Sequence, residues 1–193
     1  DIGALFAEKL DVPETHDPTE LNQIARDRLR EVFLNADAGI SGVNLAIAES
    51  GSVVLVTNEG NGRFATTAPR VHIALMGMER IVSRWEDAAV VLEVLARSAT
   101  GQRLSVYTNV ITGPRKQDDP DGPDEVHVVI IDNGRSDILG GDTAEILACI
   151  RCGACLNVCP VFRAVGGHAY GTVYSGPVGS IVTPGLWGME PWW

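Results

Sequence analysis

All four cysteines of this 193-residue chain lie in the stretch Cys149-Ile-Arg-Cys152-Gly-Ala-Cys155-Leu-Asn-Val-Cys159-Pro160. The spacing, C-x2-C-x2-C-x3-C-P, is typical of a bacterial ferredoxin-type [4Fe–4S] site, in which thiolates bind the iron atoms. Gly153 and Ala154 have the small side chains that a tight turn around a cluster needs. In modules with two clusters, the fourth cysteine, before the proline, ligates the other cluster. The stretch therefore predicts a [4Fe–4S] cofactor.

Two other uses of these cysteines compete with this prediction. A disulfide framework suits short secreted chains, but no signal peptide is visible here and the cysteines are crowded into one segment. Structural zinc sites usually combine two separated cysteine pairs, and this stretch does not have that spacing. Zinc or free thiols stay the less favoured alternatives.

The composition limits the size of the core and the class of partner. With 45% hydrophobic and 21% charged residues, the chain can bury one sizeable core and a small appendage. The formal net charge of -10 makes nucleic acid and anionic membranes poor partners for the surface as a whole. The chain opens in mid-pattern with Asp1-Ile-Gly3, so we expect it to be a piece of a longer protein.

One segment, from Ala164 to Met189, has no charged side chain over a length that could span a bilayer. Glycines and prolines interrupt it, at Gly166, Gly167, Gly171, Gly176, Pro177, Gly179, Pro184, Gly185 and Gly188. Because lipid leaves no partner for backbone groups outside a regular helix, we expect irregular chain packed on protein and no membrane span. Reduced thiols and the lack of a visible targeting signal predict a cytoplasmic location.

The N-terminal third predicts a helix followed by a β-hairpin. Asp17-Pro18-Thr19-Glu20 has the residues of an N-cap and capping box, and apolar residues recur at helical spacing to about Asn35. We expect this helix to pack on a sheet and to end at Ala38-Gly39. The apolar runs 43–48 and 52–57, joined by Glu49-Ser50-Gly51, predict the hairpin.

The rest of the first domain alternates between strands and helices. A buried strand is expected at 71–76, a nearly continuous apolar strand at 126–131, a further strand starting at 104–107, and a helix at 85–97. This order predicts an α/β fold with a mixed sheet flanked by helices, some of its strands buried on both faces. We expect a linker over 133–141, then a helix over 143–150 that delivers the cysteines. The domains would be residues 1–135, an α/β domain, and 136–193, a small helical ferredoxin-type segment.

A few other polar residues are candidates for a site. His72 and His127 lie in apolar strand runs, where a lone histidine is more often a hydrogen-bonded structural residue than a ligand. His168 follows the cysteines and has either a turn-stabilising or a cluster-modulating role. Glu49 and Glu59 lie in loops at strand ends, and Glu59 is our weak catalytic candidate. The loop 58–62 has no dinucleotide or P-loop fingerprint.

The chain resembles the iron–sulfur protein B family of the bacterial lactate-utilization system, in which a LUD domain precedes a ferredoxin-type module. The stretches that carry the resemblance include the cysteine run and occur in the family's order. They are Ile47–Ser52, Val56–Asn61, His72–Gly77, Ser98–Gln102, Cys149–Pro160, His168–Gly171 and Tyr174–Pro177. The resemblance implies a fold like that of the NagB, RpiA and CoA-transferase superfamily.

The resemblance also implies an expected cofactor content. Family members carry a second cysteine motif further along, so two [4Fe–4S] clusters are expected in the full-length protein, whereas this chain ends at Trp193 without that motif. The resemblance also implies that part of the N-terminal half is missing. Cys149, Cys152 and Cys155 would then hold the first cluster, and Cys159 the second, unless Cys159 closes the first. The tryptophan-rich tail 186–193 is too apolar to be left in water, so we expect a packed domain or a partner to cover it.

The resemblance implies an iron–sulfur electron-transfer subunit of a multi-protein system that oxidises L-lactate to pyruvate. Its partners would be the other lactate-utilization proteins and an electron carrier. The alternative is an assembly or binding module with a structural or redox-sensing cluster, and the lack of an evident acid/base pair or nucleophile triad favours it. An isomerase or CoA transferase, argued from the fold alone, leaves the cysteines unexplained.

Overall fold

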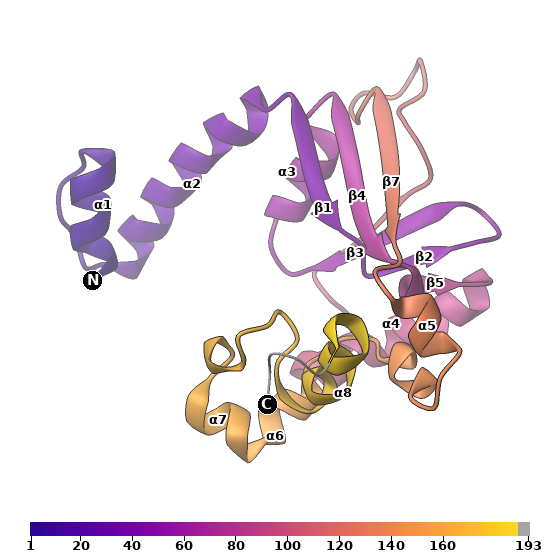
Figure 1. Cartoon of the computed structure of the whole chain (residues 1–193). Helices are drawn as coiled ribbons and strands as arrows, with labels where there is room; N and C mark the ends of the chain where they lie inside the picture. The colour runs from indigo at the N-terminus through magenta and orange to yellow at the C-terminus, as the bar shows by residue number, and fades with distance from the viewer. Residues whose placement is uncertain (189–193) are drawn as a thin grey trace.

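The computed structural model describes residues 1–188, and the chain forms an N-terminal helical arm, an α/β domain and a helical C-terminal segment (Figure 1). The elements are α1 (Ile2–Leu10), α2 (Pro18–Asn35), β1 (Ala38–Gly42), β2 (Leu45–Ile47), β3 (Ser52–Thr57), α3 (Asn61–Thr67), β4 (Val71–Gly77), η1 (Met78–Arg80), β5 (Ile81–Val82), α4 (Trp85–Thr100), β6 (Tyr107–Ile111), β7 (Glu125–Ile131), α5 (Arg135–Leu139), η2 (Ala144–Ala148), α6 (Ala154–Val158), α7 (Pro160–Val165), η3 (His168–Tyr170) and α8 (Gly176–Trp187). The predicted α/β class is confirmed.

The strands divide between two sheets. One is parallel with the order β1-β4-β7, and the other is mixed with the order β5-β2-β3-β6. The chain changes sheet between β1 and β2 at Asn44, whose backbone amide donates to Val54 O (3.0 Å) and whose Oδ1 accepts from Val56 N (2.8 Å). The single mixed sheet of the sequence prediction is thus refined to two sheets that meet.

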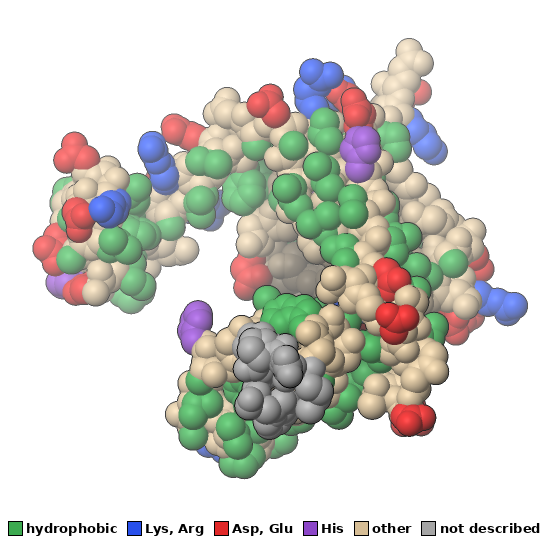
Figure 2. Space-filling model, viewed as in Figure 1, with side chains coloured by type: hydrophobic (Ala, Val, Ile, Leu, Met, Phe, Trp, Pro, Cys, Tyr) green, Lys and Arg blue, Asp and Glu red, His purple; other side chains and the backbone are tan. Residues whose placement is uncertain are grey.

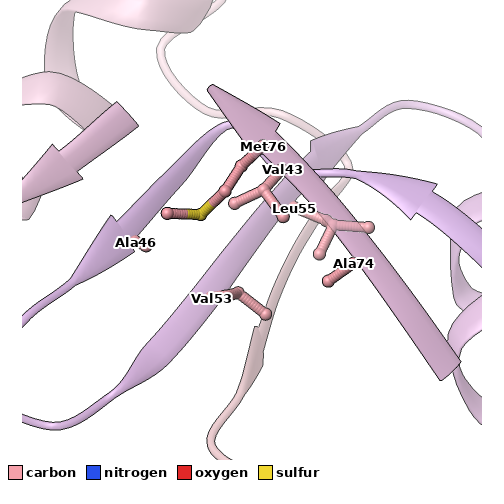
Figure 3. Close-up of a cluster of buried hydrophobic side chains, with 6 residues drawn as sticks. All are labelled: Val43, Ala46, Val53, Leu55, Ala74 and Met76. Atoms are coloured by element: carbon pink, nitrogen blue, oxygen red, sulfur yellow. The ribbon is translucent and has the colours of Figure 1, made fainter. Parts of the chain in front are cut away.

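Apolar side chains between the two sheets form the core of the α/β domain (Figure 3). The first sheet contributes Ala74 and Met76 from β4, and the second contributes residues such as Val53 and Leu55 from β3. A second cluster packs Leu45, Ile47 and Val54 against Ala88 of α4. Burial of these side chains is the main favourable term that holds the two sheets and α4 together.

The expected hairpin and helix are confirmed at nearly the predicted residues. β2 pairs antiparallel with β3, with Leu45 opposite Val54, and Gly51 has the positive φ of 67° that the turn requires. α4 ends at Gly101, which has the left-handed conformation of a helix C-cap. Strands β4 and β7 also lie where the apolar runs predict them.

The N-terminal part differs from expectation in its packing. α2 has the predicted bounds, but none of its residues is buried, and it packs mainly on α1 and α3. Glu20 does not complete a capping box because it accepts from Thr15 Oγ1 instead (2.5 Å). Ala38 and Gly39 open β1. The packing was not predicted because helical periodicity specifies an apolar face but not the element that covers it.

Strand β7 is a sheet edge and not a strand buried on both faces. Four of its apolar residues, Val128, Val129, Ile130 and Ile131, are 40 to 55% exposed. Figure 2 shows apolar side chains over the three-stranded sheet on the viewed face. The strand expected to start at 104–107 begins later than predicted, because β6 starts at Tyr107.

The C-terminal part is more regular than predicted. α5 occupies the expected linker, the helix before the cysteines is the short 3-10 helix η2, and α8 lies in the segment expected to be irregular. Pro177 is in the first turn of α8, where proline is tolerated, and this signal was available in the sequence. The tail 186–193 was expected to be covered by a packed domain or a partner, and its residues 189–193 lie outside the described part of the chain.

Candidate iron–sulfur site

The cysteine loop turns through two left-handed residues. Cys149 follows η2, Arg151 has a φ of 60°, and Gly153 has a φ of 78° and precedes α6. The turn at Gly153 is the one that the sequence predicts for a glycine. Arg151 is unexpected, because non-glycine residues seldom have a positive φ. Its surroundings must hold the backbone in this conformation.

Three of the four thiols share one pocket. Cys149, Cys152 and Cys155 line a cavity of about 670 Å³ whose other walls are largely apolar, with residues such as Ile150, Leu156, Val173 and Val178. All four cysteines are half-buried and free of disulfides. Among residues 1–188, no three cysteine Sγ atoms all lie within 4.8 Å of one another. The apolar shell around the three thiols suits an iron–sulfur cluster, whose cysteines bind different iron atoms.

Cys159 lies outside that pocket. It caps α7, where its Sγ accepts from Phe162 N at 3.5 Å, and Pro160 occupies the first helical turn. Burial raises the pKa of the Tyr170 hydroxyl, and the neighbouring Cys159 thiol raises it further. The thiols therefore divide into a group of three and a separate one.

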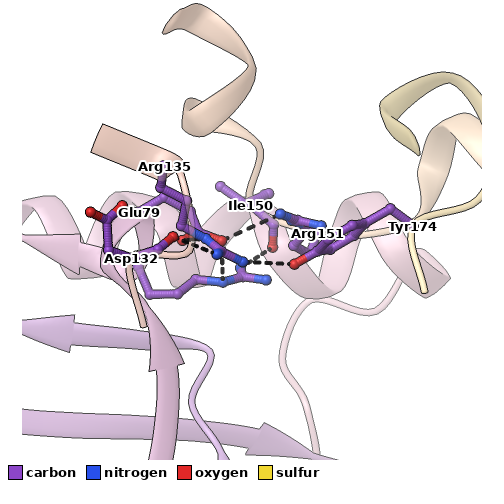
Figure 4. Close-up of polar contacts among 7 residues, drawn as sticks. Glu79, Asp132, Arg135, Ile150, Arg151 and Tyr174 are labelled. Carbon is purple, nitrogen blue, oxygen red and sulfur yellow. Dashed lines mark hydrogen bonds and ion pairs between the residues drawn. The ribbon is translucent and has the colours of Figure 1, made fainter. Parts of the chain in front are cut away.

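A buried ionic network lies at the junction between the cysteine loop and the α/β domain (Figure 4). Its centre is Glu79 in η1, with a side chain only 3% exposed. Glu79 Oε2 lies 2.7 Å from Arg135 Nε, and Oε1 lies 3.3 Å from Arg151 Nη2. Arg151 also stacks over the Tyr174 ring at 4.1 Å, and Arg135 Nη2 donates to the Tyr174 hydroxyl (2.8 Å).

Arg80 adds a third guanidinium to this network. Its Nη1 donates to the backbone oxygen of Ile150 (3.3 Å), and its Nε lies 4.0 Å from Glu79. Burial lowers the pKa of Arg80, and the nearby positive charge of Arg151 lowers it further. Three guanidinium groups thus face the Glu79 carboxylate. The Asp132 carboxylate, whose pKa is lowered by hydrogen bonds from Ser136 and by the charge of Arg135, also lies in this network, so one positive charge is left in excess beside the cysteine loop.

The sequence analysis did not identify this network. Glu79 and Arg80 directly follow the apolar strand β4, and such charged residues at the end of a buried strand were the available signal. Their partners Arg135 and Arg151 lie more than 50 residues further along the chain, so no local pattern could pair them.

The other candidate residues are dispersed. His72 is fully buried, its Nε2 lies 2.8 Å from Ser41 Oγ, and burial lowers its pKa. His127 is exposed on β7 beside Glu125 (3.1 Å), and His168 is exposed in η3. Glu49 accepts from the backbone amide of Trp85 at the start of α4 (2.9 Å), so it stabilises a helix end. Glu59 is exposed and accepts from Thr57 Oγ1 (3.1 Å).

The fold and the cysteine site together define a class of protein, an α/β domain followed by an iron–sulfur module. Residues 2–131 match the LUD domain model, and residues 145–190 match the 4Fe-4S dicluster domain model. The chain belongs to the LUD domain family. The second match confirms the predicted iron–sulfur cofactor, without giving the number of clusters. None of the helices in the described part of the chain is long and apolar enough to cross a membrane.

Curated relatives match almost the whole chain. "Lactate utilization protein B" of Shouchella clausii is 55% identical over 98% of this chain, and the proteins of the same name from Geobacillus thermodenitrificans and Bacillus subtilis are 53% identical. The chain spans 40% of the length of each of these relatives. A crystal structure of a DUF162 family protein from Deinococcus radiodurans aligns over 51% of this chain and 55% of its own, with a TM-score of 0.37 and 22% identity.

Proposed function

We propose that this chain is part of an iron–sulfur electron-transfer subunit in a multi-protein system that oxidises L-lactate to pyruvate. The observation that carries the proposal is the shared pocket of Cys149, Cys152 and Cys155, next to an α/β domain whose relatives are named for lactate utilization. We assign these three cysteines to one [4Fe–4S] cluster and Cys159 to a second, because Cys159 lies outside the pocket. Such clusters supply single-electron transfer.

The chain's own residues would control the environment of that cluster. The apolar walls of the pocket exclude water, and the loop turn at Gly153 sets the directions of the thiols. The unbalanced positive charge of Arg80, Arg135 and Arg151 favours the more negative, reduced form of an anionic cluster. Net charge and burial are among the factors that set cluster potentials, so this network is expected to raise the potential.

The remaining parts of the assignment follow from the same proposal. We place the domain boundary near Ser136 and the protein in the cytoplasm, where thiols stay reduced. The partners are other lactate-utilization proteins and a soluble electron carrier. Removal of the hydrogens from the substrate carbon and oxygen then needs a group in this chain or in a partner, and Glu59 is kept as the weak candidate.

The proposal is tested by Cys152→Ser in the full-length protein together with its partners. Lactate oxidation should be lost, while Cys159→Ala should leave the first cluster in place, with about four iron atoms per chain. A readout of iron, sulfide and the electron-spin spectrum of the dithionite-reduced chain separates the two variants. Undiminished lactate oxidation in Cys152→Ser would remove the cluster from the reaction, and complete loss of iron from Cys159→Ala would refute the three-plus-one ligand assignment.

A second candidate function is an assembly module with a structural cluster. It is favoured by the ionic network, because Arg80 and Arg151 tie the cysteine loop to Glu79 of the α/β domain. Under this reading the cluster keeps one oxidation state during turnover, and partner binding fails without it. Freeze-quenched electron-spin spectra during turnover distinguish this function from electron transfer.

A further inference from the structure

A small pocket lies between the α/β domain and the cysteine loop, distinct from the one that holds three thiols. It has a volume of about 200 Å³, and its walls include Asn44, Asn58, Thr100, Gln102, Arg151 and Cys152. Its residues come from the end of β3, the end of α4 and the cysteine loop. Three of the stretches that carry the family resemblance, at 56–61, 98–102 and 149–160, therefore meet at one cavity.

The walls of this junction pocket are partly apolar, with Val56, Leu95, Ala96 and Ala99, and partly polar, and the described residues that line it include no acidic one. Amide and hydroxyl side chains supply most of the polar groups, and Arg151 supplies the only charge. The Nε of Arg151 is buried and has no hydrogen-bond partner among residues 1–188. Because Glu79 is shared among three guanidinium groups, the positive charge beside the pocket is incompletely neutralised. Such a wall favours an anion.

Hydrogen bonds orient the amides of the junction pocket. Asn58 Oδ1 accepts from Val106 N (3.2 Å), while Asn58 Nδ2 and Thr100 Oγ1 donate to Gln102 Oε1 (3.4 and 2.6 Å). The acceptor oxygen of Gln102 is thereby occupied, and its Nε2 has no protein partner in the described part of the chain. The Gln102 Nε2 donor is thus left for an oxygen atom of a ligand, and Arg151 contributes positive charge to the wall.

We propose that the junction pocket binds a small 2-hydroxy or 2-oxo monocarboxylate, with Arg151 facing its carboxylate and the Gln102 amide facing its other oxygen. The volume is below the roughly 300–1,000 Å³ of pockets for drug-sized ligands, so a nucleotide cofactor is too large. Cys152 lines both this pocket and the thiol pocket, so the bound acid lies next to a cluster ligand. The inference rests on the proposed lactate chemistry and names the site for its substrate or product.

The test is the binding of pyruvate and L-lactate to the reconstituted full-length protein, measured by calorimetry and by the electron-spin spectrum of the reduced cluster. Both acids should bind, and pyruvate should change the spectrum, whereas propionate, which lacks the second oxygen, should bind more weakly. Gln102→Ala should weaken pyruvate binding about 5- to 10-fold, the effect of one lost hydrogen bond to a charged or polar ligand. Gln117→Ala, in an exposed loop, should bind like the wild type.

Asn58→Asp is the sharper variant. It keeps an acceptor oxygen for Val106 N but places a negative charge in the wall, so it should abolish binding of the acid without loss of iron. Equal affinity of Asn58→Asp and the wild type would overturn the inference. The inference would also be overturned if neither acid bound to a protein whose cluster reduces normally and whose lactate oxidation is intact. That result would leave the proposed function unaffected. Loss of the proposed function is recognised separately, by undiminished lactate oxidation in Cys152→Ser.

Discussion

Replacement of Glu79 by Gln would remove the central carboxylate of the junction network while preserving the shape of the side chain. Glu79 is 3% exposed, and Arg135, Arg80 and Arg151 are 8, 18 and 18% exposed, so little water would solvate the guanidinium groups left behind. Loss of one partner of a buried ion pair costs about 3–5 kcal/mol. We expect the free energy of unfolding to fall by that amount.

Urea denaturation, followed by tryptophan fluorescence and circular dichroism on the same samples, measures the loss. With a slope of about 2 kcal/mol per M, the midpoint should fall by about 1.5–2.5 M. Glu59→Gln is the matched control, because Glu59 is exposed and its replacement should change the free energy by less than about 0.5 kcal/mol. Equal midpoints for the Glu79→Gln and Glu59→Gln variants would refute the reasoning.

A double-mutant cycle separates the charge effect from packing. Arg135→Met alone removes the 2.7 Å ion pair and the hydrogen bond to Tyr174. Combined with Glu79→Gln, it also removes one of the unpaired cations that the first change creates. The double variant should therefore lose less unfolding free energy than the sum of the two single losses, by about 0.5–3 kcal/mol. Strict additivity would mean that Glu79 and Arg135 do not interact.

Two further predictions concern the α/β domain. Gly77→Ala should destabilise by about 1–3 kcal/mol in urea unfolding, because its new Cβ would lie 2.0 Å from Glu79 Oε2, which the network holds in place. Gly42→Ala, with nothing within 4 Å, should be nearly neutral, and equal effects would contradict this argument. Burial lowers the pKa of His72 below 6.5, so the unfolded chain takes up the proton first, and stability present above about pH 6.5 is lost as the pH falls. Between about pH 7.5 and 5.5, the urea midpoint of His72→Gln should fall less than that of the wild type. The exposed His127→Gln variant should show the same change of midpoint with pH as the wild type. An equal change in all three proteins would refute the role of His72.

Local signals explain which parts of the fold could be predicted. The hairpin at 43–57 combines two apolar runs with a glycine turn, and α4 has acidic residues in its first turn and Gly101 after its last. α8 was missed because its glycines and Pro184 lower helix propensity, which tertiary packing overrides. Gly179 packs closely on the backbone oxygen of Tyr174, a contact that needs a glycine and is invisible in a propensity scale.

The candidate site also has one part that local signals predict, the cofactor, and another part that they do not. Cysteine spacing predicted the cofactor because a short loop fixes the positions of the thiolates that bind one cluster, and the geometry of such a loop is local. Glu49 seemed a site candidate because it follows a strand, yet it accepts from Trp85 N, 36 residues away. Only the three-dimensional contacts distinguish a helix-capping carboxylate from a functional one.

By itself, the sequence determined the cofactor class, the α/β character and the order of most helices and strands, because these depend on residue spacing within about 20 positions. Tertiary structure alone decided that the strands form two sheets and that Glu79 meets Arg135 and Arg151. It also brought Asn58 and Gln102 to the cysteine loop. The physical reason is that burial of charges and packing of sheets join residues 20 or more positions apart, and their energies depend on surroundings that no local pattern encodes.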